Sequence, residues 1–259
     1  MPKGNLTMNF SAYGLLFALG IAISAIVAIL ICKKRNIERY EIVYSGVFTM
    51  AGAVIGAKLF FLLVSIKLII ETKPGIFDLI RGGFVFYGGL VGGMAGLFIY
   101  VKKYKLDAKD FCDIFATVTP LGHALGRVGC FFGGCCYGIE SSFGFTVHNN
   151  TLVPEINGVS RFPVARFEAF FNFLICMLLT YIFKKNSKSK LISIYFLCYA
   201  PLRFMLEFLR GDRARGVCFG LSTSQWISIA ILVYLAISAL LKTVNKYRSS
   251  TEKEKASEK

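Results

Sequence analysis

Long apolar stretches are the feature of this sequence that most restricts its fold. A helix that crosses a bilayer needs about 20 mainly apolar residues, because it rises about 1.5 Å per residue through hydrocarbon about 30 Å thick. The 259-residue chain is 55% hydrophobic and 17% charged, against roughly 25% charged residues in soluble domains. We therefore expect an all-α, polytopic membrane protein with seven transmembrane helices. Their approximate ranges are 10–32, 42–64, 83–101, 111–132, 164–183, 191–209 and 223–241.

Basic residues indicate which ends of these helices face the cytoplasm. Short cytoplasmic loops collect Lys and Arg, and basic clusters follow the first, third, fifth and seventh stretches. The N-terminus is therefore predicted to lie outside and the C-terminus in the cytoplasm. Much of the net charge of +15 is then a topology signal, which argues against nucleic-acid binding. The clusters before the last stretch contain Lys33, Lys34, Arg35, Arg39, Lys102, Lys103, Lys105, Lys109, Lys184, Lys185, Lys188 and Lys190.

The predicted helices make up one transmembrane domain, residues 1–241, with an outer loop at about 133–162. Residues 242–259 form a basic cytoplasmic tail that is poor in apolar residues and is expected to be disordered. The first stretch is longer than the apolar part of a signal peptide, and no small-residue cleavage site precedes the basic run at Lys33. We interpret it as a retained helix.

Ionisable residues inside the apolar stretches are candidates for function, since each costs at least about 2.5 kcal/mol to insert and needs a partner or a task. Tyr199, Arg203, Glu207 and Arg210 are spaced by four, four and three residues, so they lie along one stripe of the sixth helix. Arg203 and Glu207 could neutralise each other as a purely structural pair. The second arginine leaves a surplus positive charge, which a lipid phosphate would compensate.

The end of the fourth stretch, PLGHALGRVGCFFGGCCYG at 120–138, combines many glycines with one arginine. The glycines let another backbone or a ligand approach closely. Arg127 either reaches the membrane interface as a helix-end arginine or binds an anion. His123 is either a hydrogen-bonded core histidine or a catalytic base. In the third stretch, glycines at four-residue intervals from Gly88 predict tight helix packing.

Four sequence blocks stand out in the chain: AYG (12–14), FYGGLVGG (86–93), GRVGCFFGGCCYG (126–138) and YAPLRFMLEFLRGD (199–212). Together they resemble the bacterial prolipoprotein diacylglyceryl transferase family. Their order and spacing agree with that family over nearly the whole chain, as does the predicted topology. The resemblance implies a multi-pass enzyme of the bacterial cytoplasmic membrane that needs no cofactor. It would transfer the diacylglyceryl group of phosphatidylglycerol to the lipobox cysteine of a preprolipoprotein, forming a thioether and releasing glycerol phosphate, as the first step of lipoprotein maturation.

The matched blocks also supply a candidate site. The leaving group is a phosphate ester, so two convergent arginines could bind its oxygens and stabilise the developing charge. We expect Arg127 and Arg203 to form this clamp, with Glu207 orienting Arg203 and Tyr13 donating to phosphate or glycerol oxygens. The predicted phosphatidylglycerol contacts are Arg127, Arg203, Arg210, Tyr199, Gly138, Gly88 and Gly89.

The sequence leaves the general base open. A thiolate is the nucleophile, so a group must take the thiol proton. Tyr87 stands where the family's HGG motif has its histidine, and Tyr87 and His123 are the catalytic candidates for this step. The family's HPSQLYE block appears as FPVARFE at 162–168, which keeps Pro163 and Glu168.

Three cysteines at the outer end of the fourth stretch suggest other functions. Cys130, Gly133 and Cys135 stand where the family usually has Asn, Asn and Glu, and Cys136 follows directly. Disulfides are chemically allowed outside the membrane, so one alternative is a membrane thiol oxidoreductase. Others are a transporter or binding protein for a lipid or organic anion, and a transferase of the same fold with a different acceptor. We expect no metal site, because the cysteines lack a second ligand pair.

Overall fold

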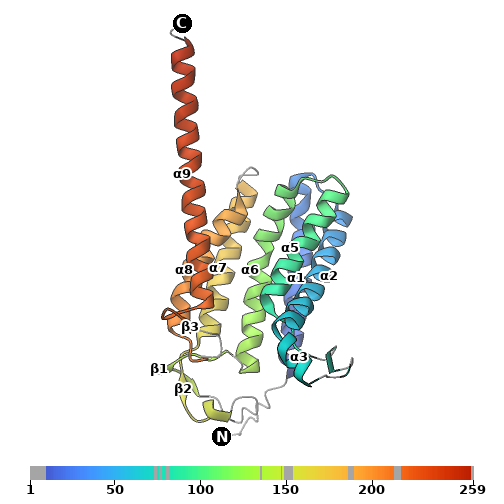
Figure 1. The fold of residues 1–259 in the computed structure, drawn as a ribbon, viewed down its shortest axis with the longest axis vertical. Helices are drawn as coiled ribbons and strands as arrows, with labels where there is room; N and C mark the ends of the chain where they lie inside the picture. Colours follow the sequence, from blue (N-terminus) through green and yellow to red (C-terminus); the bar gives the residue numbers. More distant parts are fainter. Residues whose placement is uncertain are drawn as a thin grey trace. The chain divides into compact units, whose positions relative to one another are not determined.

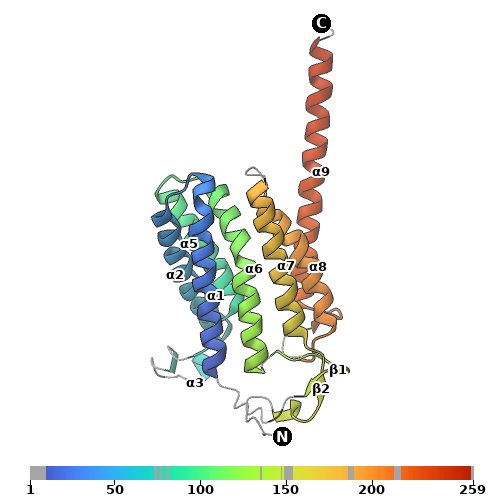
Figure 2. The same ribbon diagram turned by 180° about the vertical axis from the view of Figure 1, so that it is seen from behind.

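The computed structural model has a helix at each of the seven predicted segments (Figures 1 and 2). It describes residues 10–72, 75, 78–79, 82–134, 136–146, 148, 154–185, 190–212 and 217–257. The long helices are α1 (Phe10–Ile31), α2 (Arg39–Val64), α5 (Phe86–Lys103), α6 (Ala108–Gly133), α7 (Val164–Lys185), α8 (Leu191–Phe208) and α9 (Thr223–Ser257). The short ones are η1 (Cys32–Arg35), α3 (Ile66–Thr72) and η2 (Pro154–Ile156).

Five helices of the described chain, α1, α2, α7, α8 and α9, are long and apolar enough to cross a membrane. The other two long helices differ from them in composition. Helix α5 is rich in glycine, whereas α6 carries Lys109, Asp110, Asp113 and Arg127. Length and composition alone therefore identify five candidate membrane-spanning helices.

The structure departs from an all-α fold in the loops. Strand β1 (Glu140–Thr146) pairs antiparallel with β2 (Ser160–Arg161), and β3 (Val217–Cys218) pairs with β4 (Leu221–Ser222). The first pair lies inside the segment predicted as a plain outer loop. Pairing gives the N–H and C=O groups of these loops partners that an irregular connection lacks.

Helix α9 continues through the tail that was expected to be disordered and ends at Ser257. The expectation rested on low apolar content alone. The tail is nevertheless rich in Lys and Glu, which are good helix formers. Because the apolar part of α9 already provides the nucleus, extending the helix does not incur the cost of a first turn. In the structure, residues 242–257 are part of α9.

Contacts group the chain into two compact units, residues 1–24 with 116–259, and residues 25–115. The boundary falls within α1 and α6. In the first unit α8 packs between α7 and α9, and the start of α1 packs on α6. There a Cβ at Gly20 would lie 3.1 Å from the Gly122 carbonyl oxygen, and the Ser24 hydroxyl donates to the Val118 carbonyl at 3.2 Å.

The second unit is organised by the packing of α2 against α5, which lie side by side in both views (Figures 1 and 2). A Cβ on Gly92 would lie 2.2 Å from the carbonyl oxygen of Gly52, and one on Gly96 equally close to that of Phe48. The two backbones can approach this closely only where side chains are absent. The tight helix packing predicted from the glycine spacing is confirmed.

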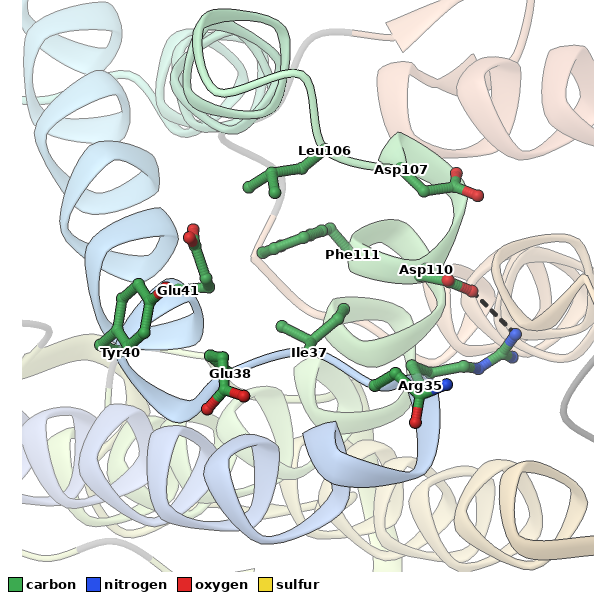
Figure 3. Close-up of a pocket in the computed structure, with 10 residues that line it drawn as sticks. Arg35, Ile37, Glu38, Tyr40, Glu41, Leu106, Asp107, Asp110 and Phe111 are labelled. Atoms are coloured by element: carbon green, nitrogen blue, oxygen red, sulfur yellow. Dashed lines mark hydrogen bonds and ion pairs between the residues drawn. The ribbon is translucent and has the colours of Figure 1, made fainter.

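One end of this unit holds an ion-pair network beside a pocket of about 330 Å³ (Figure 3). Arg35 donates to Asp110 at 2.9 Å and to Asp113 at 3.0 Å. Tyr100 donates to Glu41 at 2.6 Å. Figure 3 shows the Arg35 and Asp110 side chains joined next to the pocket. These contacts tie η1 and α2 to α5 and α6, and the pocket is lined by residues other than those predicted for the site.

We expect Gly92→Ala to destabilise the protein by about 1–3 kcal/mol, because the added methyl group has no room between the backbones. Gly46→Ala is the matched control in the same pair of helices, since nothing lies within 4 Å of a Cβ there. It should leave stability unchanged or raise it slightly, as alanine is the better helix former. Thermal unfolding in detergent measures both, and equal stabilities would contradict the packing argument.

Candidate functional site

Glu168, in the second turn of α7, is the centre of the site. Its side chain is fully buried, and a buried carboxylate is tolerated only when it is paired. Arg127 of α6 places Nε 3.1 Å from Oε2, and the Tyr199 hydroxyl of α8 donates to Oε1 at 3.0 Å. Arg203 and Arg210 approach Oε2 with their Nη1 atoms at 3.8 and 3.9 Å. Three arginines therefore converge on one carboxylate oxygen.

The stripe predicted on the sixth helix contributes most of this cluster. Arg203 forms an ion pair with Glu207, with Nη2 and Oε2 2.5 Å apart. The same Nη2 donates to the Ser224 hydroxyl at the start of α9, at 3.1 Å. The predicted Arg203–Glu207 contact is thus present, and Ser224 fixes the guanidinium from a second helix.

The prediction that the arginines of this stripe carry a surplus positive charge is wrong. Arg210 makes two hydrogen bonds to Asp212, at 2.9 and 2.6 Å. With Glu168 and Glu207, three carboxylates accompany the three arginines in the described cluster. Spacing along one helix could not reveal this, because Glu168 comes from α7 and Asp212 lies beyond the end of α8. Burial by itself lowers the pKa of Arg210, but the interactions with Asp212 and Cys136 together outweigh burial and raise that pKa above its ordinary value.

Although the charges of the described cluster balance, several of its buried polar atoms have no hydrogen-bond partner. The Nη1 atoms of Arg203 and Arg210 are buried and have no hydrogen-bond partner within the described part of the chain. The same holds for the Oε2 atom of Glu168, which has ion pairs but no well-aligned hydrogen bond. Buried polar atoms without such partners are costly. The N–H groups of these two Nη1 atoms are suited to donate hydrogen bonds to the oxygens of an anionic ligand.

The geometry of His123 favours the core-histidine interpretation. The Nε–H of Arg127 donates to Nε2 of His123 at 3.3 Å, and the imidazole contacts the Tyr199 ring edge-on, with centroids 5.2 Å apart. The same Nε2 lies 3.5 Å from Glu168 Oε1. Because Nε2 accepts a hydrogen bond from a guanidinium, it must give up that bond before it can receive a proton. This arrangement suits a residue that positions Arg127.

Gly138 acts through its backbone. It forms an isolated antiparallel bridge with Arg210, and a Cβ there would lie 2.3 Å from the Phe162 carbonyl oxygen. Neighbouring hydrogen bonds run from Ile139 N–H to the Leu209 carbonyl and from Gly211 N–H to the Tyr137 carbonyl, both at 3.0 Å. The glycine therefore lets the loop after α6 join the end of α8, which positions Arg210.

Tyr13 lies on α1 against α6. A Cβ at Gly129 would lie 3.2 Å from Cδ2 of the tyrosine ring, which also stacks on Phe17 with centroids 6.2 Å apart. Gly129 belongs to the glycine-rich segment that ends α6. A small residue at this position is what lets the Tyr13 ring pack against the helix.

Tyr87, Gly88 and Gly89 belong to the other unit, at the start of α5. A Cβ on Gly88 would lie 2.4 Å from the carbonyl oxygen of Gly56. Helix packing explains this glycine. The catalytic role predicted for Tyr87 and the lipid contacts of Gly88 and Gly89 stay predictions.

The cysteines of the fourth stretch adjoin the arginine cluster. Nη1 of Arg127 donates to Sγ of Cys136 at 3.6 Å, and Cys130 is close enough to influence Arg127 electrostatically. No disulfide joins the cysteines of the described residues. Cys135 lies outside the described residues, so its predicted place in the cysteine cluster stays a prediction.

Glu168 and Asp212 are the site residues that sequence reasoning missed. Both acidic residues lie in sequence blocks that match the family. Glu168 is one of the few residues that FPVARFE shares with the family's HPSQLYE block, and Asp212 is the last residue of YAPLRFMLEFLRGD. The requirement that an ionisable residue in a membrane stretch has a partner applies to Glu168 as much as to the arginines. Applied there, it would have pointed to the centre of the site.

The fold and the site define a multi-pass membrane protein with a buried cluster of arginines and carboxylates. A family model for prolipoprotein diacylglyceryl transferases matches residues 5–241. The chain belongs to this family. It is 32% identical to the phosphatidylglycerol–prolipoprotein diacylglyceryl transferase of Clostridium tetani, over 93% of this chain and 95% of that protein. It is also 32% identical to phosphatidylglycerol–prolipoprotein diacylglyceryl transferase 2 of Clostridium perfringens, over 95% of this chain and 94% of that protein. The identity to the transferase of Finegoldia magna is 30%, over 85% of this chain and 86% of that protein.

Glu168→Gln should destabilise the protein by about 3–5 kcal/mol, because it leaves buried guanidiniums without their shared counter-charge. Glu140→Gln is the matched control, since that side chain is 72% exposed and its ion pair with Arg161 is a surface contact, worth about 0–1 kcal/mol. Thermal unfolding in detergent measures both.

A double-mutant cycle sharpens this test. Adding Arg127→Gln to Glu168→Gln removes the charge that the first change exposes, so the double variant should be more stable than the sum of the two single effects. Strict additivity would show that the two residues do not depend on each other.

Proposed function

We propose that this chain transfers the diacylglyceryl group of phosphatidylglycerol to the lipobox cysteine of preprolipoproteins. The relatives' names supply the lipid donor, the protein acceptor and the group transferred. The observation that carries the proposal is the convergence of Arg127, Arg203 and Arg210 on one buried oxygen of Glu168 in a chain of this family. Such a cluster is built to hold an anionic oxygen where little water competes.

The reaction explains why arginines are needed. The acceptor thiolate attacks the terminal glycerol carbon of the diacylglyceryl group, and the bond between that carbon and the phosphate oxygen breaks. A thioether forms, and glycerol phosphate leaves with one more negative charge than the phosphodiester carried. Guanidiniums that already point at the leaving oxygens stabilise this charge without first having to reorganise.

Glu168 prepares the arginines for this task. By attracting Arg127, Arg203 and Arg210 together, it overcomes the mutual repulsion of three cations in a low-dielectric site. A phosphodiester brings a single negative charge, which the Nη1 donors of Arg203 and Arg210 can bind without displacing Glu207 or Asp212 from their arginines. Glu168 is thus a positioning residue that keeps the clamp assembled between turnovers.

The rival functions have less support. A thiol oxidoreductase needs cysteines that face each other, whereas Cys136 contacts Arg127. A transporter or binding protein would use the same arginines without covalent chemistry, and none of the relatives compared above is named as one. The transferase function accounts for the arginines and the family together.

We further propose that all seven long helices cross a bacterial cytoplasmic membrane with the N-terminus outside. Three of the four charges that set α6 apart are paired within the protein, and the fourth, Lys109, lies at the exposed start of the helix. Asp113 is 1% exposed and bound to Arg35, and Arg127 is bound to Glu168. Helix α5 packs against α2 through glycines. Both helices are therefore compatible with hydrocarbon surroundings despite their composition.

Arg127→Ala and Arg203→Ala should each lower the rate of lipid transfer by about 100-fold or more, since each removes donors to the leaving phosphate. Arg39→Ala, at the exposed start of α2, is the matched control and should retain activity. The measurement is mass spectrometry of a lipobox peptide in a bacterium depleted of its own transferase, with each variant shown to be folded in the membrane. Retained transfer in both site variants would refute the clamp.

The topology predicts which thiols a membrane-impermeant maleimide reaches in intact spheroplasts. The exposed Cys218 should be labelled, because it lies in the loop before α9 that is proposed to face outward. A cysteine introduced by Lys102→Cys, at an exposed position near the end of α5, should be labelled only after the membrane is opened. The reverse pattern would invert the orientation.

A further inference from the structure

Cys136 occupies a fixed place beside the arginine cluster. On its C-terminal side, Tyr137, Gly138 and Ile139 are paired with the backbone of residues 209–211, through hydrogen bonds of 3.0 Å and the Gly138–Arg210 bridge. This pairing holds the thiol next to the end of α8. Its side chain is neither buried nor fully exposed, so a second molecule can reach it.

Two guanidiniums face this thiol. Nη1 of Arg127 donates to Sγ at 3.6 Å, and the guanidinium of Arg210 is close enough to this thiol to interact with it electrostatically. The Arg210 side chain is only 2% exposed, and its Nη1 has no hydrogen-bond partner in the described chain. Neighbouring cations favour the thiolate over the thiol. The cluster also contains Glu168 and Asp212, but each of these carboxylates is engaged by an arginine.

We infer that Cys136 is the general base of the proposed transfer, taking the proton of the acceptor cysteine as a thiolate. The inference rests on the proposed function, which requires such a base. His123 directs its Nε2 at Arg127, whereas Cys136 presents a partly accessible sulfur to the same arginine. A thiolate is well matched to a thiol as proton donor, because the two groups have similar intrinsic acidities.

The Cys136 thiolate takes the proton of the acceptor thiol and becomes a thiol, and the acceptor becomes the thiolate. That thiolate forms a bond to the terminal glycerol carbon, and the electrons of the broken carbon–oxygen bond go to glycerol phosphate. The product has gained a negative charge on its phosphate, so it can carry the proton of Cys136 away and restore the thiolate.

The first arm of the test is kinetic. Cys136→Ser should lower kcat by about 100-fold to 10,000-fold, the usual contribution of a general base, with little change in KM for phosphatidylglycerol. Cys218→Ser is the control, because that thiol lies in the exposed β3–β4 turn, and it should match the unmodified chain. Imidazole should partly restore transfer by Cys136→Gly, which a merely structural role would not allow.

The second arm measures the thiol itself. Peptide mapping after brief iodoacetamide treatment at pH 7 should show Cys136 alkylated faster than the more exposed Cys218, and Arg127→Gln should remove this advantage. Full transfer by Cys136→Ser would overturn the base while leaving the transferase intact. Diacylglyceryl found on Cys136 itself would also overturn it, because the residue would then be an acceptor. If the chain without any substitution transferred no diacylglyceryl group to the lipobox cysteine, both the proposed function and the inference would be refuted.

Discussion

The burial of one carboxylate, Glu168, among three arginines is the interaction on which the rest of the site depends. A lone buried carboxylate or guanidinium is strongly unfavourable, so each charge is stable only when the others are in place. The partners come from α6, α8 and the segment after α8, while Glu168 comes from α7. These elements must therefore pack correctly before the charges are satisfied, which couples the fold of this unit to the assembly of its site.

Backbone pairing extends this coupling to the loops. Arg210 lies beyond the last turn of α8, where a helix alone could not fix its direction. The bridge to Gly138 and the two hydrogen bonds to Asp212 fix it instead. The glycine is required because the Phe162 carbonyl comes too close for a side chain. A short pairing outside the helices thus orients one of the three buried cations.

Periodicity within single segments predicted a large part of this arrangement. Apolar length located the helices, and four-residue spacing identified both the glycine contacts of α5 and the Arg203–Glu207 pair. Contacts between segments were not accessible in this way. Nothing in the spacing of one helix shows that Glu168 of α7 meets Arg127 of α6, or that Asp212 balances Arg210. The error about surplus charge arose because charges were counted along one helix, whereas a buried cluster is neutralised across several.

Arg127 links the two halves of the proposed chemistry. It contacts Glu168 through Nε and Cys136 through Nη1, so one guanidinium serves both the anion site and the thiol. A phosphodiester entering the cluster competes with the thiolate for the same positive charge. As the guanidinium turns toward phosphate, the thiolate loses stabilisation and becomes a stronger base. Lipid binding would then activate proton removal from the acceptor only when the leaving group is already held.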